Sequence, residues 1–324
     1  MTGDGPLRRI AASLGASCLP RAMDLAGSPY ADGYPQYRSA VMAWLAGHGV
    51  PAALRAALER FRDDWGAGGA LLLERLVPVP LDLPDTPLMP FVRGRRVIGT
   101  EAALLACSLM LGEPFGLTDW HGGDRLQNLY PLRAERTAQN ASNAVELEVH
   151  TESAFRANTP DALLLLCLRA DPQVVTTICD LRAVRAILPD QMAVLLDEPG
   201  FAFRTDGENG LTPPQPIRYG AAAGVGRHDR YHYADALVGT TPGHARTLDA
   251  LRCAIRSASV SVRMGPGDVL LIDNTHIVHG RSAYEPRYDG SDRWLQRCLL
   301  SRCRDADLAH VGRATDGVGS EKEP

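Results

Sequence analysis

The sequence lacks any apolar run of the length that a membrane span needs. A span takes about 18 or more consecutive apolar residues, whereas the best stretches here, 162–168 and 269–272, have the length of a strand and are followed by charged residues. The first residues, MTGDGPLRRIAASLGAS, begin polar and hold no sustained apolar segment, so no secretory signal is expected. We therefore predict a cytoplasmic protein that makes no contact with a membrane.

An excess of charge of one sign is also absent. The 324 residues include 34 Lys and Arg against 38 Asp and Glu, for a formal net charge of −4. Without a basic field to attract a polyanion, nucleic acid is not an expected partner. The composition, 45% hydrophobic and 22% charged, is typical of a globular chain that buries a large core.

The seven cysteines include no CxxC pair, and their number is odd. Most stand inside apolar runs, as Cys107 does in EAALLACSLM and Cys167 in LLLLCLRA. This pattern indicates buried, reduced thiols rather than a disulfide framework or a zinc–thiolate site.

The hydrophobic pattern changes along the chain. Apolar residues at helical spacing predict helices over 39–48, 52–65 and 101–111, with a strand-like stretch over 70–83. From about residue 125 onward short strands alternate with turn residues, which predicts a sandwich or jelly roll. We expect a mainly β single domain over 1–312, with helical decoration: a mostly helical part over 1–110, a core over 111–312, and a disordered tail over 313–324.

The segment VELEVHTESAF carries the first chemical signal. His150 and Glu152 are two residues apart, so on a strand their side chains share a face. A third candidate ligand, His279, follows the buried strand in GPGDVLLIDNTHIVHGRSAY. Two imidazoles and one carboxylate form the facial triad of non-haem Fe(II) oxygenases, which leaves coordination positions open, whereas a structural zinc site is closed by four ligands.

Taken alone, His150 is more often a hydrogen-bonded polar residue at a strand end. His276, three residues before His279, could be a rival ligand on a loop, but a place beside the ligands or at the surface is favoured for it. The other histidines, least clearly His121, are interpreted as ordinary surface or hydrogen-bonded imidazoles. Arg293 favours the interpretation of His150 and His279 as metal ligands, because it follows His279 across a turn, at the start of the last expected strand. An antiparallel return would place its guanidinium beside the metal, where it can bind a carboxylate in two-point fashion.

The order of motifs resembles the clavaminate synthase-like group of Fe(II)/2-oxoglutarate oxygenases. The motifs are HTESAF, PDALLLLCLR, VVTTICD, GDVLLIDN and VHGRSAYEPRYDGSDRWLQR. That group includes asparagine oxygenase and the arginine and lysine hydroxylases of antibiotic biosynthesis, and the likeness is good over about residues 110–303. The resemblance implies a double-stranded β-helix, or jelly roll, decorated with helices.

The resemblance also implies roles for individual residues. His150, Glu152 and His279 would bind Fe(II), and Arg293 would pair with the distal carboxylate of the co-substrate 2-oxoglutarate. Thr176, rather than Thr177, would hydrogen-bond the same carboxylate. Arg297 matches a position that contacts the substrate's carboxylate in relatives, although an ordinary charge at a strand end is an equal alternative.

Two departures from the group bear on the substrate. Amino-acid hydroxylases of the group usually carry a glutamine-bearing stretch before the strand expected from residue 127, whereas this chain reads TDWHGGDRL there. Trp120, in this stretch, is therefore a candidate contact of the substrate. Relatives that bind cationic side chains carry acidic residues before the last helix, where this chain reads RHDRYHYAD. Asp229 is the only early acid of this segment, and tyrosines, Tyr231 and Tyr233, stand in place of a second. A guanidine substrate is therefore not supported, and a free amino acid and a neutral derivative such as a cyclic dipeptide have equal standing.

We predict an Fe(II)- and 2-oxoglutarate-dependent oxygenase that uses O₂ to hydroxylate an unactivated C–H bond of an amino acid or an amino-acid-derived small molecule. Desaturation or ring closure is possible at the same kind of site. Two alternatives come from other classes. One is a zinc hydrolase, which Arg293 disfavours because a hydrolase needs no anchor for 2-oxoglutarate, and the other is a non-catalytic jelly-roll module that binds a structural metal.

Overall fold

The structure is a computed structural model that describes residues 5–10, 19, 25–64, 69–80, 82–90, 97–117, 121–138, 140–156, 159–204, 210–220 and 229–302. Among these residues, none of the helices has the length and apolarity that crossing a membrane requires. The tail expected to be disordered, 313–324, lies outside the described residues.

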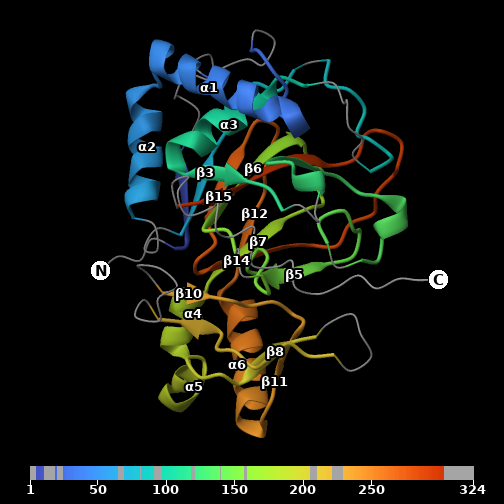
Figure 1. The fold of residues 1–324 in the computed structure, drawn as a ribbon. Coiled ribbons are helices and arrows are strands. Elements are labelled where there is room, and N and C mark those ends of the chain that lie inside the picture. Colours follow the sequence, from blue (N-terminus) through green and yellow to red (C-terminus); the bar gives the residue numbers. More distant parts are fainter. Residues whose placement is uncertain are drawn as a thin grey trace, which may run out of the picture.

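A seven-stranded sheet lies at the centre of the described fold (Figure 1). Its strand order is β1-β2-β13-β6-β15-β3, and β4 also pairs with β15. All of its pairs are antiparallel except β1 with β2. The strands are β1 (Leu7–Ile10), β2 (Ala70–Leu73), β3 (Glu113–Phe115), β4 (Leu126–Leu129), β6 (Ala162–Arg169), β13 (Val269–Asp273) and β15 (Trp294–Ser301).

A second sheet of four antiparallel strands has the order β12-β7-β14-β5. Its strands are β5 (Leu147–His150), β7 (Thr176–Asp180), β12 (Val260–Val262) and β14 (Ile277–Arg281). One cluster of buried side chains joins the two sheets, since Ile178 and Ile277 of the second sheet pack with Leu163 and Leu270 of the first. The sheets therefore face each other across a shared apolar layer.

Strand β6 shows why its sequence, ALLLLCLR, is apolar without interruption. Leu163, Leu165 and Cys167 point into the layer between the sheets. The alternate residues Leu164 and Leu166 join the core on the opposite face. Because side chains alternate along a strand, a strand covered on both faces needs an apolar residue at nearly every position.

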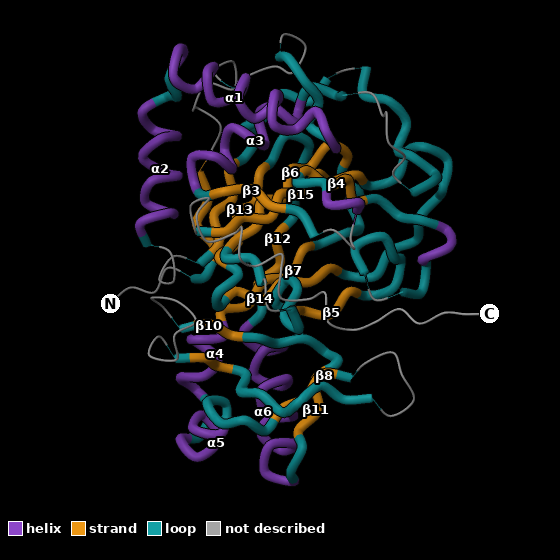
Figure 2. The backbone as a smooth tube through the Cα atoms, in the orientation of Figure 1, coloured by secondary structure: helices purple, strands orange, loops and turns teal. Residues whose placement is uncertain are grey.

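Helices cover the outer faces of both sheets (Figures 1 and 2). The first core cluster joins the seven-stranded sheet to α1 (Tyr34–His48), α2 (Ala52–Asp63) and α3 (Thr100–Leu111). Another cluster joins the four-stranded sheet to α4 (Leu181–Ile187) and α6 (Pro242–Ala258), with α5 (Asp190–Leu195) beside them. Two small antiparallel pairs complete this part: β8 (Phe201–Phe203) with β11 (Leu237–Gly239), and β9 (Arg218–Tyr219) with β10 (Arg230–Tyr231).

The mainly β architecture with several helices agrees with the prediction, but the prediction of a mostly helical first third is only partly right. Strands β1 and β2 from this third extend the large sheet. Two arginines interrupt β1, so its sequence shows no strand pattern, and pairing with β2 determines its conformation. Strand β14 was also missed, although it carries His279.

The cysteines that the structure describes are free thiols, as expected. Cys107, Cys167, Cys179 and Cys298 are buried, and Cys253 is exposed.

Candidate metal centre

Two imidazoles face each other on neighbouring strands of the four-stranded sheet. His150 ends β5 and pairs directly with His279 of β14, so their rings lie 4.7 Å apart between centroids. Ile277 points between the sheets, and residues two apart on a strand point to the same face. The His279 ring therefore also points inward. Gly280 allows the close approach, because a Cβ at this position would stand 2.5 Å from the Leu147 carbonyl oxygen of β5.

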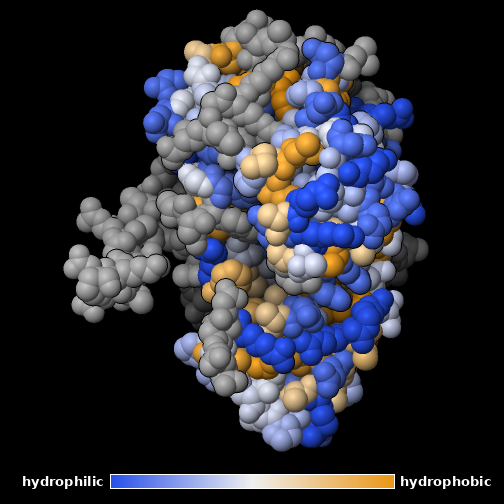
Figure 3. Space-filling model, turned by 90° about the vertical axis from the view of Figure 1, so that its right-hand side faces the viewer, coloured by the Kyte–Doolittle hydropathy of each residue, from blue (hydrophilic) through white to orange (hydrophobic). Residues whose placement is uncertain are grey.

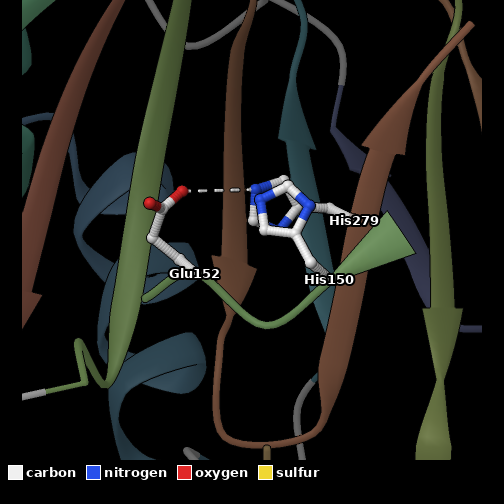
Figure 4. Close-up of side chains that lie close together, drawn as sticks. All are labelled: His150, Glu152 and His279. Atoms are coloured by element: carbon white, nitrogen blue, oxygen red, sulfur yellow. Dashed lines mark ion pairs between the residues drawn. The ribbon is translucent and has the colours of Figure 1, made fainter. Parts of the chain in front are cut away.

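The third member, Glu152, is held by its backbone just beyond β5. Its N–H donates to Asn274 Oδ1 (2.8 Å), and Asn274 Nδ2 donates back to the Glu152 carbonyl oxygen (3.2 Å). Glu152 Oε2 lies 3.6 Å from His279 Nε2, and the three side chains point toward one another (Figure 4). One ligand atom from each of the three residues lies within 4.8 Å of the other two. The convergence predicted from the sequence is confirmed.

The electrostatics of His150 and Glu152 suit the binding of a cation. Removal from water and the neighbouring His279 ring lower the pKa of His150 to about 4, so the ring is neutral near pH 7. His150 Nδ1 lies 2.9 Å from the Glu148 carbonyl oxygen, which favours the tautomer whose Nε2 lone pair is available to a metal. Burial works to raise the pKa of Glu152, but the Arg297 guanidinium and the imidazoles lower it well below its usual range. Two imidazoles, of which that of His150 is neutral, and an ionised carboxylate suit Fe(II).

A cavity of about 790 Å³ contains this triad. Arg293 lines it, and among the described residues none forms an ion pair or hydrogen bond with its guanidinium. Thr176 of β7 also lines the cavity, whereas the next residue, Thr177, points to the other face of its strand. Asp292 holds the loop before Arg293, since its carboxylate accepts hydrogen bonds from the N–H groups of Arg287 (2.8 Å) and Tyr288 (2.6 Å).

Arg297 is buried at the same cavity and contacts the triad directly. Its Nη1 donates to Glu152 Oε2 at 2.8 Å. Its Nε and Nη2 donate to Gln127 Oε1 at 2.9 and 2.6 Å. Gln127 of β4 lies opposite Arg297 in the strand register, and both share the inward face of their strands with leucines, Leu129 and Leu295. Gln127 thus orients the guanidinium, and the guanidinium orients the carboxylate.

We predict that Gln127→Ala lowers Fe(II) affinity about tenfold, because outer partners of metal ligands typically contribute 10–100-fold to metal affinity. The measurement is an anaerobic Fe(II) titration of the protein in the presence of 2-oxoglutarate. Gln173→Ala, at an exposed position between β6 and β7, is the matched control. Unchanged Fe(II) affinity in Gln127→Ala would show that the Arg297–Glu152 pair does not need its glutamine.

Other residues singled out from the sequence lie elsewhere. Asp229 is not brought to the cavity: its carboxylate accepts hydrogen bonds from Arg218 Nε (3.0 Å) and Nη2 (2.7 Å), because the β9–β10 pairing places these two residues together. His276 is buried, with Nδ1 3.0 Å from Thr275 Oγ1, and is not a member of the triad. Trp120 lies outside the described residues. His121 lines a smaller neighbouring cavity of about 320 Å³.

Three residues of this site were not predicted from the sequence. Gln127 was overlooked because a glutamine was sought before the strand, although its spacing from Leu129 places it on the inward face. Asn274 gave no signal beyond its place in a turn. Asp235, six residues after Asp229, lines the cavity in its place, and the sequence offered no means of choosing between the two.

Comparison with known proteins agrees with this geometry. Residues 213–299 match the family described as "Taurine catabolism dioxygenase TauD, TfdA family". L-asparagine oxygenase of Streptomyces coelicolor is 33% identical over 293 residues, which are 86% of this chain and 85% of the relative. Clavaminate synthase 2 of Streptomyces clavuligerus is 29% identical over 280 residues, with 83% and 85% covered.

This chain belongs to the TauD/TfdA dioxygenase family. It is an Fe(II)/2-oxoglutarate-dependent oxygenase of the group that contains asparagine oxygenase and clavaminate synthase, as its motifs predicted. The solved structure of asparagine oxygenase in complex with Fe(II), 2S,3S-3-hydroxyasparagine and succinate superimposes on the oxygenase with a TM-score of 0.80, at 28% identity and over 90% of this chain and 93% of that one. OrfP in complex with Fe and alpha-ketoglutaric acid gives a TM-score of 0.75 at 26% identity, over 93% and 95%. The family membership argues against the zinc hydrolase and the non-catalytic module.

Proposed function

We propose that this oxygenase hydroxylates an unactivated C–H bond of an amino acid or an amino-acid-derived small molecule, such as a cyclic dipeptide, in specialised metabolism. The observation that carries the proposal is that the His150–Glu152–His279 triad, Arg293 and Arg297 line one cavity. Relatives named L-lysine 3-hydroxylase and enduracididine beta-hydroxylase support hydroxylation of amino acids as the class of reaction. We interpret the two facing sheets as a double-stranded β-helix and the described chain as one domain.

In this proposal each residue has a defined task. His150, Glu152 and His279 hold Fe(II) from one side, and Arg293 with Thr176 binds the distal carboxylate of 2-oxoglutarate. When bound, iron supplies the oxidising chemistry, in which O₂ converts 2-oxoglutarate to succinate and CO₂ and oxygenates the substrate. Arg297 keeps Glu152 ionised and in place, and its guanidinium, which lines the cavity, is the candidate contact for a carboxylate of the substrate. The apolar part of the cavity wall excludes water from the reacting C–H bond.

The test is 2-oxoglutarate turnover by the Fe(II)-loaded protein across a panel of free amino acids and cyclic dipeptides. We expect succinate formation with one class of compound and a product heavier by one oxygen atom. A product lighter by two hydrogen atoms would instead indicate desaturation or ring closure. A response to free amino acids alone would exclude the cyclic dipeptide. Failure of every member of the panel to stimulate succinate formation would contradict the proposal.

A further inference from the structure

One wall of the cavity is apolar and comes mainly from the part of the molecule that carries α6. We call Phe155, Phe203, Ala234 and Ala236 the apolar wall; all four line the cavity. Phe203 lies on β8, and Ala236 accepts a hydrogen bond from the Arg204 N–H at 3.0 Å, so the segment before β11 is fixed against the end of β8. The co-substrate candidates stand elsewhere: Thr176 begins β7, and Arg293 immediately precedes β15.

The two rings of the apolar wall are arranged to receive a ligand. Phe155 and Phe203 meet edge to face, with centroids 6.3 Å apart and planes 70° apart. Phe203 is buried, whereas Phe155 remains 63% exposed, only three residues from Glu152. An exposed phenyl ring beside a metal site leaves apolar surface in water, and a ligand with an apolar group would cover it. Apolar residues also reach the surface at mid-height on the side shown in Figure 3.

The charges around the cavity do not favour a cationic side chain. Five arginines line it, against three acidic residues: Glu148, Glu152 and Asp235. Glu152 belongs to the triad, and Asp235 lies 3.7 Å from Arg252 of α6. Two acidic residues, Glu146 and Asp235, and two arginines of α6, Arg252 and Arg256, lie near Glu148. An additional cation would therefore meet an excess of positive side chains, and two of the three carboxylates, Glu152 and Asp235, already lie beside an arginine.

We propose that the substrate carries an aromatic or branched aliphatic side chain, which packs on the Phe155–Phe203 pair and against Ala234 and Ala236. The small alanine side chains leave room on this wall and offer no polar group, so an amide or guanidinium packed against them would lose hydrogen bonds with water. This inference rests on the proposed function, because it names the substrate class of the same cavity.

The direct test is calorimetric binding to the protein loaded with Fe(II) and 2-oxoglutarate under anaerobic conditions. The probes are L-phenylalanine, L-leucine and their cyclic dipeptides with glycine, compared with L-arginine, L-lysine and L-asparagine. We expect the best apolar probe to bind at least about tenfold more tightly than the best polar one. Tighter binding of L-arginine, L-lysine or L-asparagine, or no binding of any apolar probe, would overturn the inference.

Two sets of variants locate the contact. Phe155→Ala should weaken binding of the apolar probe about tenfold, and Phe155→Leu should retain most of it. If Glu148→Gln or Asp235→Asn weakens binding more than Phe155→Ala does, charge rather than apolar contact holds the side chain, and the inference is wrong.

Ala236→Asp provides the reverse experiment. A carboxylate in the apolar wall should lower affinity for the apolar probe and raise affinity for L-arginine, each about tenfold. Ala186→Asp, at an exposed position of α4, is the matched control. Affinities in Ala236→Asp equal to those in the control would show that Ala236 does not face the side chain and would overturn the inference.

The outcomes separate this inference from the proposed function. Binding of L-phenylalanine without succinate formation or product would support the apolar wall and contradict hydroxylation. Hydroxylation of L-arginine or L-asparagine would support the proposed function and overturn the apolar side chain.

Discussion

His279→Ala is expected to abolish Fe(II) binding and, with it, turnover of 2-oxoglutarate. The variant leaves one imidazole and one carboxylate, and it removes the ring whose Nε2 lies 3.6 Å from Glu152 Oε2. Loss of an outer partner of a metal ligand already costs about 10–100-fold in metal affinity, so loss of the ligand itself should cost more than about 100-fold. The measurement is the visible absorbance that Fe(II) and 2-oxoglutarate develop together on the protein without oxygen.

The control for this variant is His48→Ala, which removes an exposed imidazole near the end of α1 that stacks on Trp44. It should bind Fe(II) and turn over 2-oxoglutarate as the parent protein does. Circular dichroism should show that His279→Ala keeps its fold. If folded His279→Ala still develops the absorbance at the parent's Fe(II) concentration, the triad is wrongly assigned.

Arg293→Ala is expected to raise the KM for 2-oxoglutarate at least about 30-fold. Truncating one partner of a buried, hydrogen-bonded charge pair costs about 2–5 kcal/mol, and in the described structure no carboxylate of the chain pairs with this guanidinium. Burial lowers the pKa of Arg293, which is the signature of a cation removed from water. Steady-state succinate formation at increasing 2-oxoglutarate gives KM and kcat separately.

Two further variants sharpen the result. Arg293→Lys keeps the charge but loses the two-point geometry of the guanidinium, so its KM should fall between those of the parent and Arg293→Ala. Arg60→Ala, at an exposed position of α2, should leave KM unchanged. A parent-like KM in Arg293→Ala would assign the anchoring of 2-oxoglutarate to another residue.

The spacing of residues in the sequence was enough to predict the triad and the position of Arg293 near it. His150 and Glu152 stand two residues apart at the end of a strand, and Arg293, predicted at the start of the last strand, immediately precedes β15. The alternation of Leu295, Arg297 and Leu299 along β15 also follows from strand period, because all three share one face.

The structure differs from the predictions made from the sequence where residues far apart in the chain contact each other. Strand β1 has a sequence with no strand pattern, and the hydrogen bonds of β2 determine its conformation. Asp229 and Asp235 lie in one short segment, yet the pairing of β9 with β10 sends Asp229 to Arg218 and leaves Asp235 at the cavity. No local pattern distinguishes these two carboxylates.

The sequence by itself determined the residue types of the metal centre, the strand-rich architecture and the family, because these depend on spacing within a few residues and on motifs. Only the tertiary structure decided which side chains meet. The pairing of β5 with β14 places His150 opposite His279, the pairing of β4 with β15 joins Gln127 to Arg297, and the segment before β11 brings Ala236 to the cavity. These contacts join residues far apart in the chain, and their formation depends on sheet register and packing, which local spacing does not determine.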